Sequence, residues 1–107
     1  MAEILVIGGG AAGMMAALTA AEDSRNRVTL LERQQRVGRK LLATGNGRCN
    51  LTNMGAAPAH YHGEDPAFVL PALRALPPEE TLRLFRSFGL LTVTEPGGRV
   101  YPLSDSA

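Results

Sequence analysis

The chain has 107 residues, of which 45% are hydrophobic, a formal net charge of +1 and a single cysteine. The near-zero charge gives no case for a nucleic-acid or polyanion partner, and the length allows one domain with a modest core. Because Cys49 is alone, an internal disulfide is excluded and a reducing cytoplasm is favoured.

The chain begins with a predicted strand, a glycine turn, a helix and a second strand. Ile4–Ile7 and Val28–Leu31 are unbroken runs of leucine and β-branched residues. Such runs predict parallel strands that are buried on both faces. Between them, Gly8, Gly10 and Gly13 fit the pattern G-x-G-x-x-G, which is typical of dinucleotide-binding turns.

Each residue of this turn has an expected physical role. Gly8 permits the sharp turn, Gly10 removes a side chain where a pyrophosphate must approach, and Gly13 lets the helix lie close to the first strand. Ala11 and Ala12 begin the helix without an acid, although acids usually occupy the positive end of a helix. We interpret the missing anion as a bound phosphate.

Glu32 closes the second strand, 19 residues after Gly13. This is close to the position of the acid that contacts the ribose in dinucleotide-binding folds, and its carboxylate is expected beside the glycine turn. A glycine-rich turn that serves only packing is the alternative interpretation. The apolar run Ile4–Ala21 has Glu3 where a signal peptide needs positive charge, so we expect a soluble, cytoplasmic protein with no membrane partner.

A polar connection, Arg33–Val37, follows the second strand. Gly38–Leu42 is expected to form a helical turn that inserts Leu41 and Leu42 into the core. Ala43–Asn53 is dense in glycine and asparagine, which favours a coil that supplies backbone and amide donors to a polar ligand.

The segment that follows contains two histidines and one predicted helix. Met54–Gly63 is expected to be a surface loop in which His60 and His62 are solvated, because no further ligands at suitable spacing support a metal site. Asp65–Leu76 is expected to form a short helix that Asp65 caps and that Pro71 limits or kinks.

The last third of the sequence predicts a helix and a hairpin. Pro78–Phe88 begins with proline and two acids and is ended by Gly89, and its apolar stripe of Leu82, Phe85 and Phe88 is expected to pack in the core. Leu90–Thr94 and Arg99–Leu103 flank a turn and predict two antiparallel strands.

A resemblance to a known family emerges at Gly38–Asn53. The string Gly-Arg-Lys-Leu-Leu-Ala-Thr-Gly-Asn-Gly-Arg-Cys-Asn-Leu-Thr-Asn resembles the hallmark of the BaiN-like NAD(P)/FAD-dependent oxidoreductases, also labelled aminoacetone-oxidase-family FAD-binding flavoproteins. Gly97–Ala107 is similar to the family's Gly-Arg-Val-Phe-Pro segment, with Tyr101 in the aromatic place. The resemblance spans the whole chain but only the N-terminal part of a family member.

The resemblance implies an α/β fold, a Rossmann-like FAD-binding domain of the glutathione-reductase class. Residues 1–107 would be the N-terminal portion of this discontinuous domain: an incomplete β-α-β unit with further helices and a C-terminal β-hairpin. The inserted β-rich and helical domains, and the return of the FAD-binding domain, would lie outside the chain.

The resemblance also implies a set of cofactor-binding residues. They are Gly8, Gly10, Ala11, Ala12 and Gly13 for the pyrophosphate, Glu32 and Arg33 for the ribose region, and Lys40, Leu41, Thr44, Gly45, Gly47, Arg48, Cys49 and Asn50 towards the flavin. The implied activity is hydride or electron transfer through FAD to an unknown small-molecule substrate, with NAD(P)H as a candidate transient donor. The isolated chain is expected to be inactive.

No residue stands out as catalytic. Arg48 could place positive charge near a reduced flavin or form a loop salt bridge, and Cys49 could be redox-active or, as we favour, a buried structural thiol. Two other functions stay open: an NAD-binding dehydrogenase domain, and a non-catalytic nucleotide-binding fragment that self-associates through an open sheet edge. NADP is disfavoured because Glu32 would repel its 2′-phosphate, an effect that Arg33 could partly offset.

Overall fold

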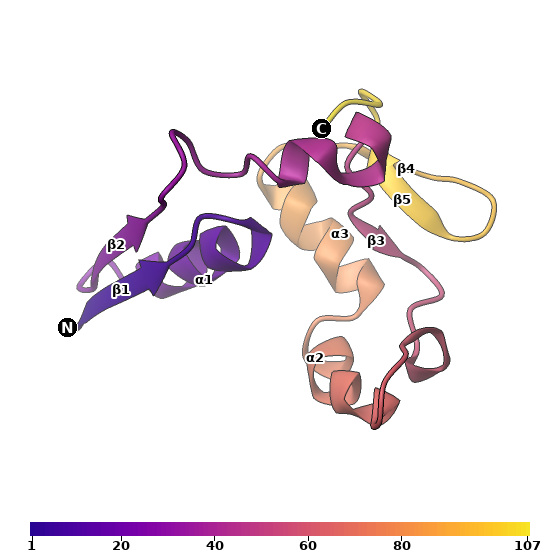
Figure 1. The fold of residues 1–107 in the computed structure, drawn as a ribbon, viewed down its shortest axis with the longest axis horizontal. Coiled ribbons are helices and arrows are strands. Elements are labelled where there is room, and N and C mark those ends of the chain that lie inside the picture. The colour runs from indigo at the N-terminus through magenta and orange to yellow at the C-terminus, as the bar shows by residue number, and fades with distance from the viewer. The chain divides into compact units, whose positions relative to one another are not determined.

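The computed structural model describes all 107 residues, which divide into two compact units, Met1–Thr44 and Gly45–Ala107 (Figure 1). The 3-10 helix η1 (Leu41–Gly47) carries the chain from the first unit into the second. Each unit contains its own sheet, of two strands in the first and three in the second.

The first unit is a parallel β-α-β arrangement. Strands β1 (Glu3–Ile7) and β2 (Arg27–Leu31) pair along their whole length, and helix α1 (Ala11–Ala21) connects them and packs on both. Both strands and the helix were predicted from the sequence. In this unit α1 is the only helix that packs on the sheet.

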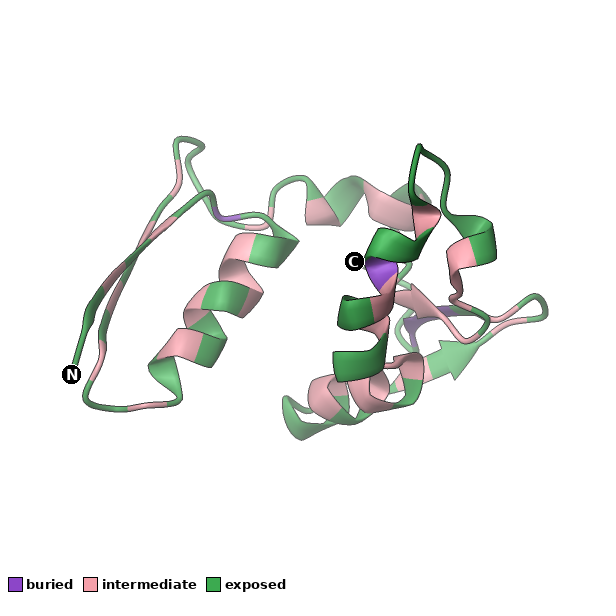
Figure 2. Cartoon of the chain, turned by 90° about the horizontal axis from the view of Figure 1, so that it is seen from below, coloured by how far each residue is buried: buried purple, intermediate pink, exposed green.

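The prediction that both strands are buried on both faces is wrong. Exposure alternates along each strand, as the alternating colours in Figure 2 show. Leu5, Ile7 and Leu31 lie on one face and are 58%, 80% and 51% exposed. Val6 lies on the other face, towards α1. A helix on one side of a two-stranded sheet covers one face only, so continuous apolar runs here include residues that this unit leaves exposed.

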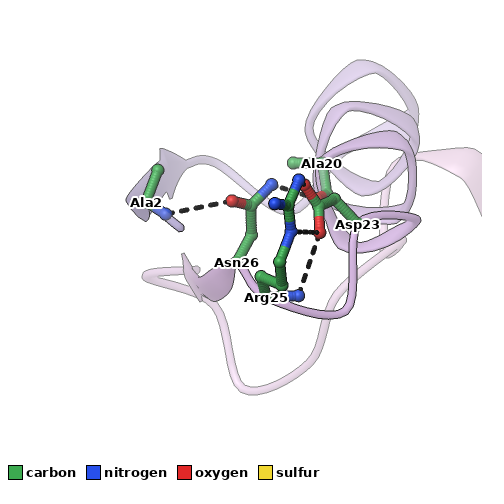
Figure 3. Close-up of polar contacts among 5 residues, drawn as sticks. All are labelled: Ala2, Ala20, Asp23, Arg25 and Asn26. Atoms are coloured by element: carbon green, nitrogen blue, oxygen red, sulfur yellow. Dashed lines mark hydrogen bonds and ion pairs between the residues drawn. The ribbon is translucent and has the colours of Figure 1, made fainter.

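The turn between α1 and β2 is held by the side chain of Asn26 (Figure 3). Its Oδ1 accepts a hydrogen bond from the Ala2 N–H at 3.0 Å, and its Nδ2 donates to the Ala20 carbonyl oxygen at 2.9 Å. Asp23 accepts hydrogen bonds from the backbone and guanidinium of Arg25 in the same turn. Asn26 thereby ties the end of the helix to the start of both strands.

The predicted helix at Asp65–Leu76 is divided into two elements. The 3-10 helix η3 (Pro66–Val69) is followed directly by α2 (Leu70–Ala75). Asp65 caps η3 as predicted, by accepting from the Ala67 N–H at 3.2 Å. Pro71 lies in the first turn of α2 and has no N–H, which explains why the helical hydrogen bonds restart at this point.

Helix α3 (Pro78–Ser87) follows the sequence prediction in its start and end. Its first turn carries two acids, and Gly89, at φ +91°, closes it. The apolar stripe is less buried than predicted: Phe85 packs edge to face against Phe88, with ring centroids 6.0 Å apart, but Phe88 is 54% exposed. Phe88 is the C-cap residue and lies beyond the last residue of the helix, Ser87.

The second unit is built around a three-stranded antiparallel sheet. Strand β5 (Arg99–Pro102) lies between β3 (Thr52–Asn53) and β4 (Thr92–Thr94). The hairpin of β4 and β5 was predicted, whereas β3 was not. Val100 is fully buried and Tyr101 is 5% exposed, so the central strand carries the core of this unit.

The region from Ala43 to Gly63 was predicted to be coil and loop, and this is wrong in part. It contains the second half of η1, strand β3 and the 3-10 helix η2 (Pro58–His60). Leu42 was predicted to insert into the core but is 41% exposed. A tight 3-10 turn separates neighbouring side chains by about 120°, so Leu41 and Leu42 cannot share one buried face.

The packing of α1 on β1 predicts a large effect of Gly13→Ala. A Cβ at this position would lie 1.8 Å from the Gly8 carbonyl oxygen. We expect Gly13→Ala to destabilise the protein by about 3 kcal/mol or to prevent folding, as strong overpacking does. Thermal unfolding measures this, with Gly10→Ala as the control because a Cβ there meets no atom within 4 Å. Equal stability of the two variants would contradict the observed packing.

Candidate nucleotide-binding site

The three glycines of the motif are needed for three different reasons. Gly8 has φ +100°, which only glycine adopts readily. Gly13 is fixed by packing, because any side chain would collide with the Gly8 carbonyl. Gly10 has φ −78°, which every residue can adopt, and a Cβ there would point into open space. The fold therefore requires glycine at positions 8 and 13. At position 10 the fold does not require glycine, and the space beside it is open to a group from outside the chain.

Two further glycines shape the turn, and the sequence analysis did not select either. Gly9 is buried, and a Cβ on it would lie 2.7 Å from Cγ1 of Val37. Its carbonyl oxygen accepts a hydrogen bond of 2.7 Å from the N–H of Gly38, which has φ +71°. The glycine triplet and the isolated Gly38 are the signals that could have identified them.

Glu32 lies beside the glycine turn, as predicted. Its Oε2 accepts a hydrogen bond of 2.7 Å from the Gly9 N–H, and its Oε1 accepts one of 3.0 Å from the Gln34 N–H. These two bonds, from Gln34 first and then Gly9, lower the pKa of the Glu32 carboxyl below its ordinary value. A carboxylate offers about four acceptor sites, so Glu32 keeps capacity for donors such as ribose hydroxyls.

The start of α1 is open and positive. Gly10 is its N-cap, no side chain caps it, and its first turn contains no acid. The N–H groups of Ala11, Ala12 and Gly13 have no acceptor within the helix, as at every helix start. Gly10, Ala11 and Ala12 are all exposed. Unpaired N–H groups and the helix dipole together favour an anion at this position.

The remaining candidate residues of the first unit are less closely tied to the turn. Arg33 and Lys40 are exposed, and neither forms an ion pair or a side-chain hydrogen bond. Leu41 and Thr44 lie in η1, where the Thr44 hydroxyl donates to the Leu41 carbonyl oxygen at 2.7 Å. The motif glycines and Glu32 therefore lie together around one turn. The four remaining candidate residues make no hydrogen bond or ion pair with the glycines of that turn.

The other candidate residues belong to the second unit. Gly45 and Gly47 have φ +57° and +84°, and Cys49 has φ +60° and is 6% exposed. Arg48 forms ion pairs, as the salt-bridge hypothesis held, and Asn50 is exposed. The buried position of Cys49 agrees with a structural thiol.

Neither a metal cluster nor a membrane helix is found. No three side chains of histidine, cysteine, aspartate or glutamate come together at metal-binding distance, and His60 and His62 are exposed. None of the helices combines the length and the hydropathy that crossing a membrane requires.

A parallel β-α-β unit with an open glycine-rich helix start and an acid at the end of the second strand defines a Rossmann-like nucleotide-binding domain. Residues 2–107 match the family described as HI0933-like protein Rossmann domain. The chain belongs to this family, the BaiN-like FAD-dependent oxidoreductases, and the resemblance found in the sequence is confirmed.

Three of the curated relatives that are similar to this chain illustrate the family. The 3-dehydro-bile acid delta(4,6)-reductase of Clostridium scindens is 49% identical over the whole chain, which covers 26% of that protein. The ribosomal RNA dihydrouridine synthase of Haemophilus influenzae is 42% identical over 66% of the chain, and that of Escherichia coli 33% over 98%. These matches cover 18% and 26% of the two synthases, so the chain spans about a quarter of its relatives' length.

The hydrogen bonds to Glu32 predict a specific pH dependence of stability. Because the folded-state pKa is lowered, the carboxylate contributes stability above its ordinary pKa of about 4.3 and loses it as the pH falls through the folded-state pKa. We expect Glu32→Gln to lower the unfolding midpoint at pH 7, and we expect its difference from the unsubstituted protein to disappear as the pH falls through the folded-state pKa. The exposed Glu22→Gln variant is the control. A midpoint difference that is independent of pH would contradict the carboxylate's role.

Proposed function

We propose that this chain is the FAD-binding portion of a flavin-dependent oxidoreductase. The glycine turn and the start of α1 bind the pyrophosphate, and Glu32 binds the adenosine ribose. The observation that supports this most directly is the empty space at Gly10. A glycine that neither its backbone angle nor its packing requires is expected where a ligand must approach the main chain.

The chain's own groups suit the ADP half of the cofactor. The N–H groups of Ala11, Ala12 and Gly13 can donate to phosphate oxygens, and the positive helix end offsets the negative charge. Glu32 is already held by Gly9 and can accept ribose hydroxyls with its remaining lone pairs. When bound, FAD supplies the redox chemistry through its isoalloxazine ring, while the protein binds and orients it.

FAD fits better than the nicotinamide cofactors at this site. The ADP half is common to FAD and NAD, so the turn and Glu32 do not separate them. The segment Gly38–Asn53 favours FAD, since its resemblance is to a flavoprotein hallmark and an NAD site would not need it. NADP is disfavoured because the Glu32 carboxylate, which is ionised at neutral pH, would face a 2′-phosphate. NAD(P)H as an electron donor would bind elsewhere.

We further propose that Gly45–Asn50 also binds the cofactor and that the domain is of the glutathione-reductase class. The chain covers about a quarter of its relatives' length, so the rest of the flavin site and the substrate site are assigned to residues outside this chain. Arg33 would bind in the ribose region together with Glu32, and Lys40, Leu41 and Thr44 would contact the cofactor towards the flavin.

The names of the relatives suggest a substrate class. A delta(4,6)-reductase acts, by its name, on carbon–carbon double bonds of a 3-oxo bile acid, and dihydrouridine is uridine with two added hydrogens. In both cases the reduced double bond is conjugated to a carbonyl group. We propose that the protein reduces such a conjugated double bond in a small molecule by adding a hydride, which bound FAD would supply after its own reduction by a donor, and a proton from solvent.

A ribosomal RNA substrate is the second candidate, because two of the three relatives are named for it. We favour the small molecule, since identity is higher to the bile acid reductase over the whole chain and the net charge of +1 offers little attraction for RNA. Oxidation of the reduced flavin by a conjugated ketone but not by unmodified ribosomal RNA distinguishes the two.

The removal of space at Gly10 tests the cofactor assignment. We expect Gly10→Val to keep the fold, because its φ of −78° suits valine and its Cβ meets no atom within 4 Å, but to lose bound FAD. The measurement is flavin absorbance per polypeptide in the protein that carries this chain, with circular dichroism as the folding control. Full flavin content in a folded Gly10→Val variant would refute the proposed geometry.

A self-associating, non-catalytic chain is the alternative from another class. Its motivation is the unpaired outer edge of β1 and the exposed side chains of Leu5 and Ile7. Light scattering of the isolated chain, with and without FAD, tests this alternative. We expect association in the absence of FAD; a stable monomer that ignores FAD would count against an incomplete flavin domain.

A further inference from the structure

Arg48 is held by three residues of its own unit. Its Nη2 donates to Oε1 of Glu95 and its Nε donates to Oδ1 of Asp105. Its guanidinium carbon lies 3.9 Å from the centroid of the Tyr101 ring. We call these four residues the Arg48 cluster. Glu95 follows β4, Tyr101 lies in β5 and Asp105 comes after β5, so one side chain connects its loop to three separate points.

The loop that carries Arg48 has an unusual backbone. Asn46 and Cys49 have φ +55° and +60°, and Gly45 and Gly47 also have positive φ. Left-handed angles at residues other than glycine cost free energy and persist only where the surroundings enforce them. Arg48 lies between these positions. Its two ion pairs and its stacked ring therefore help to enforce this conformation, together with the hydrogen bond of 2.8 Å from the Ala107 N–H to the Gly47 carbonyl oxygen.

The rest of the loop has little freedom. The Leu51 N–H donates to the Val100 carbonyl oxygen at 2.9 Å, which fixes the end of the loop against β5. A Cβ on Gly45 would lie 2.7 Å from the Asn50 nitrogen and 3.2 Å from Cε1 of Tyr101. Arg48 thus stacks over the face of the buried Tyr101 ring, and any side chain at position 45 would meet the edge of the same ring.

The charge of the Arg48 cluster argues against a direct electrostatic role. One guanidinium faces two carboxylates, so the cluster as a whole has no net positive charge to offer an anionic flavin. The carboxylates of Glu95 and Asp105 raise the pKa of the Arg48 guanidinium. This agrees with a cation whose charge is neutralised by its two ion-pair partners.

We propose that Arg48 is a positioning residue that fixes the Gly45–Asn50 backbone in its cofactor-binding conformation and does not supply charge to the flavin. The inference rests on the proposed function, in which Gly45–Asn50 binds the cofactor. The planar fork of arginine donates in two directions while its face stacks on Tyr101. A lysine keeps the charge but cannot reproduce this geometry.

The test compares three variants of the full-length protein that carries this chain. Arg48→Lys keeps the charge and loses the fork, Glu95→Gln weakens one anchor and leaves Arg48 in place, and Arg99→Met removes an exposed cation of β5 that has no ion pair. We expect the first two to weaken FAD affinity about tenfold through lost charge-assisted hydrogen bonds. With FAD saturating, both keep the flavin reduction potential of the unsubstituted protein. Arg99→Met changes neither.

Two results would overturn the inference. One is Arg48→Lys with unchanged FAD affinity; the other is Glu95→Gln with a raised flavin potential, because a released arginine would then act by charge. If the unsubstituted protein binds no FAD, the proposed function fails instead. Hydrogen exchange of the Gly45–Leu51 amides then decides the positioning role: faster exchange in Arg48→Lys supports it, and unchanged exchange refutes it.

Discussion

The hydrogen bond between the Gly9 N–H and the Glu32 carboxylate is the interaction on which the candidate site depends. It joins the turn after the first strand to the end of the second, and it is possible because the parallel register places Ile7 opposite Leu31. The same bond holds the carboxylate beside the open helix start, and with the hydrogen bond from the Gln34 N–H, the larger cause, it lowers the pKa of Glu32. A positive helix end and a fixed anion are thereby held close together, which suits a ligand with both a diphosphate and a hydroxyl-bearing sugar.

Much of this local arrangement could be predicted from the sequence. The apolar runs, the spacing of Gly8, Gly10 and Gly13 and the position of Glu32 specify the strands, the turn and the acid, because each depends on residues close together in the chain. The hairpin of β4 and β5 and the cap at Asp65 follow from local signals in the same way. The family was likewise recognisable from the contiguous string Gly38–Asn53.

The features that could not be predicted depend on distant residues. Strand β3 is two residues long, which is too short for a hydrophobic pattern that would predict a strand. It forms because its backbone pairs with the edge of β5. Arg48 meets partners 47 and 57 residues away, so no spacing rule could have identified them. The exposure of Leu5, Ile7 and Phe88 depends on which elements cover them, and an apolar run does not carry that information.

Gly8, Gly10 and Gly13 are glycine for different physical reasons, and these reasons predict which of the three positions can vary among related proteins. Selection for a foldable chain acts on Gly8 and Gly13 whether or not a cofactor is present, because backbone angle and packing demand them. Neither backbone angle nor packing requires glycine at position 10. In family members that no longer bind the nucleotide, we expect larger residues to replace glycine at position 10, while positions 8 and 13 remain glycine. If the proposed cofactor site is correct, the residue at position 10 therefore distinguishes family members that bind the nucleotide from those that have lost it.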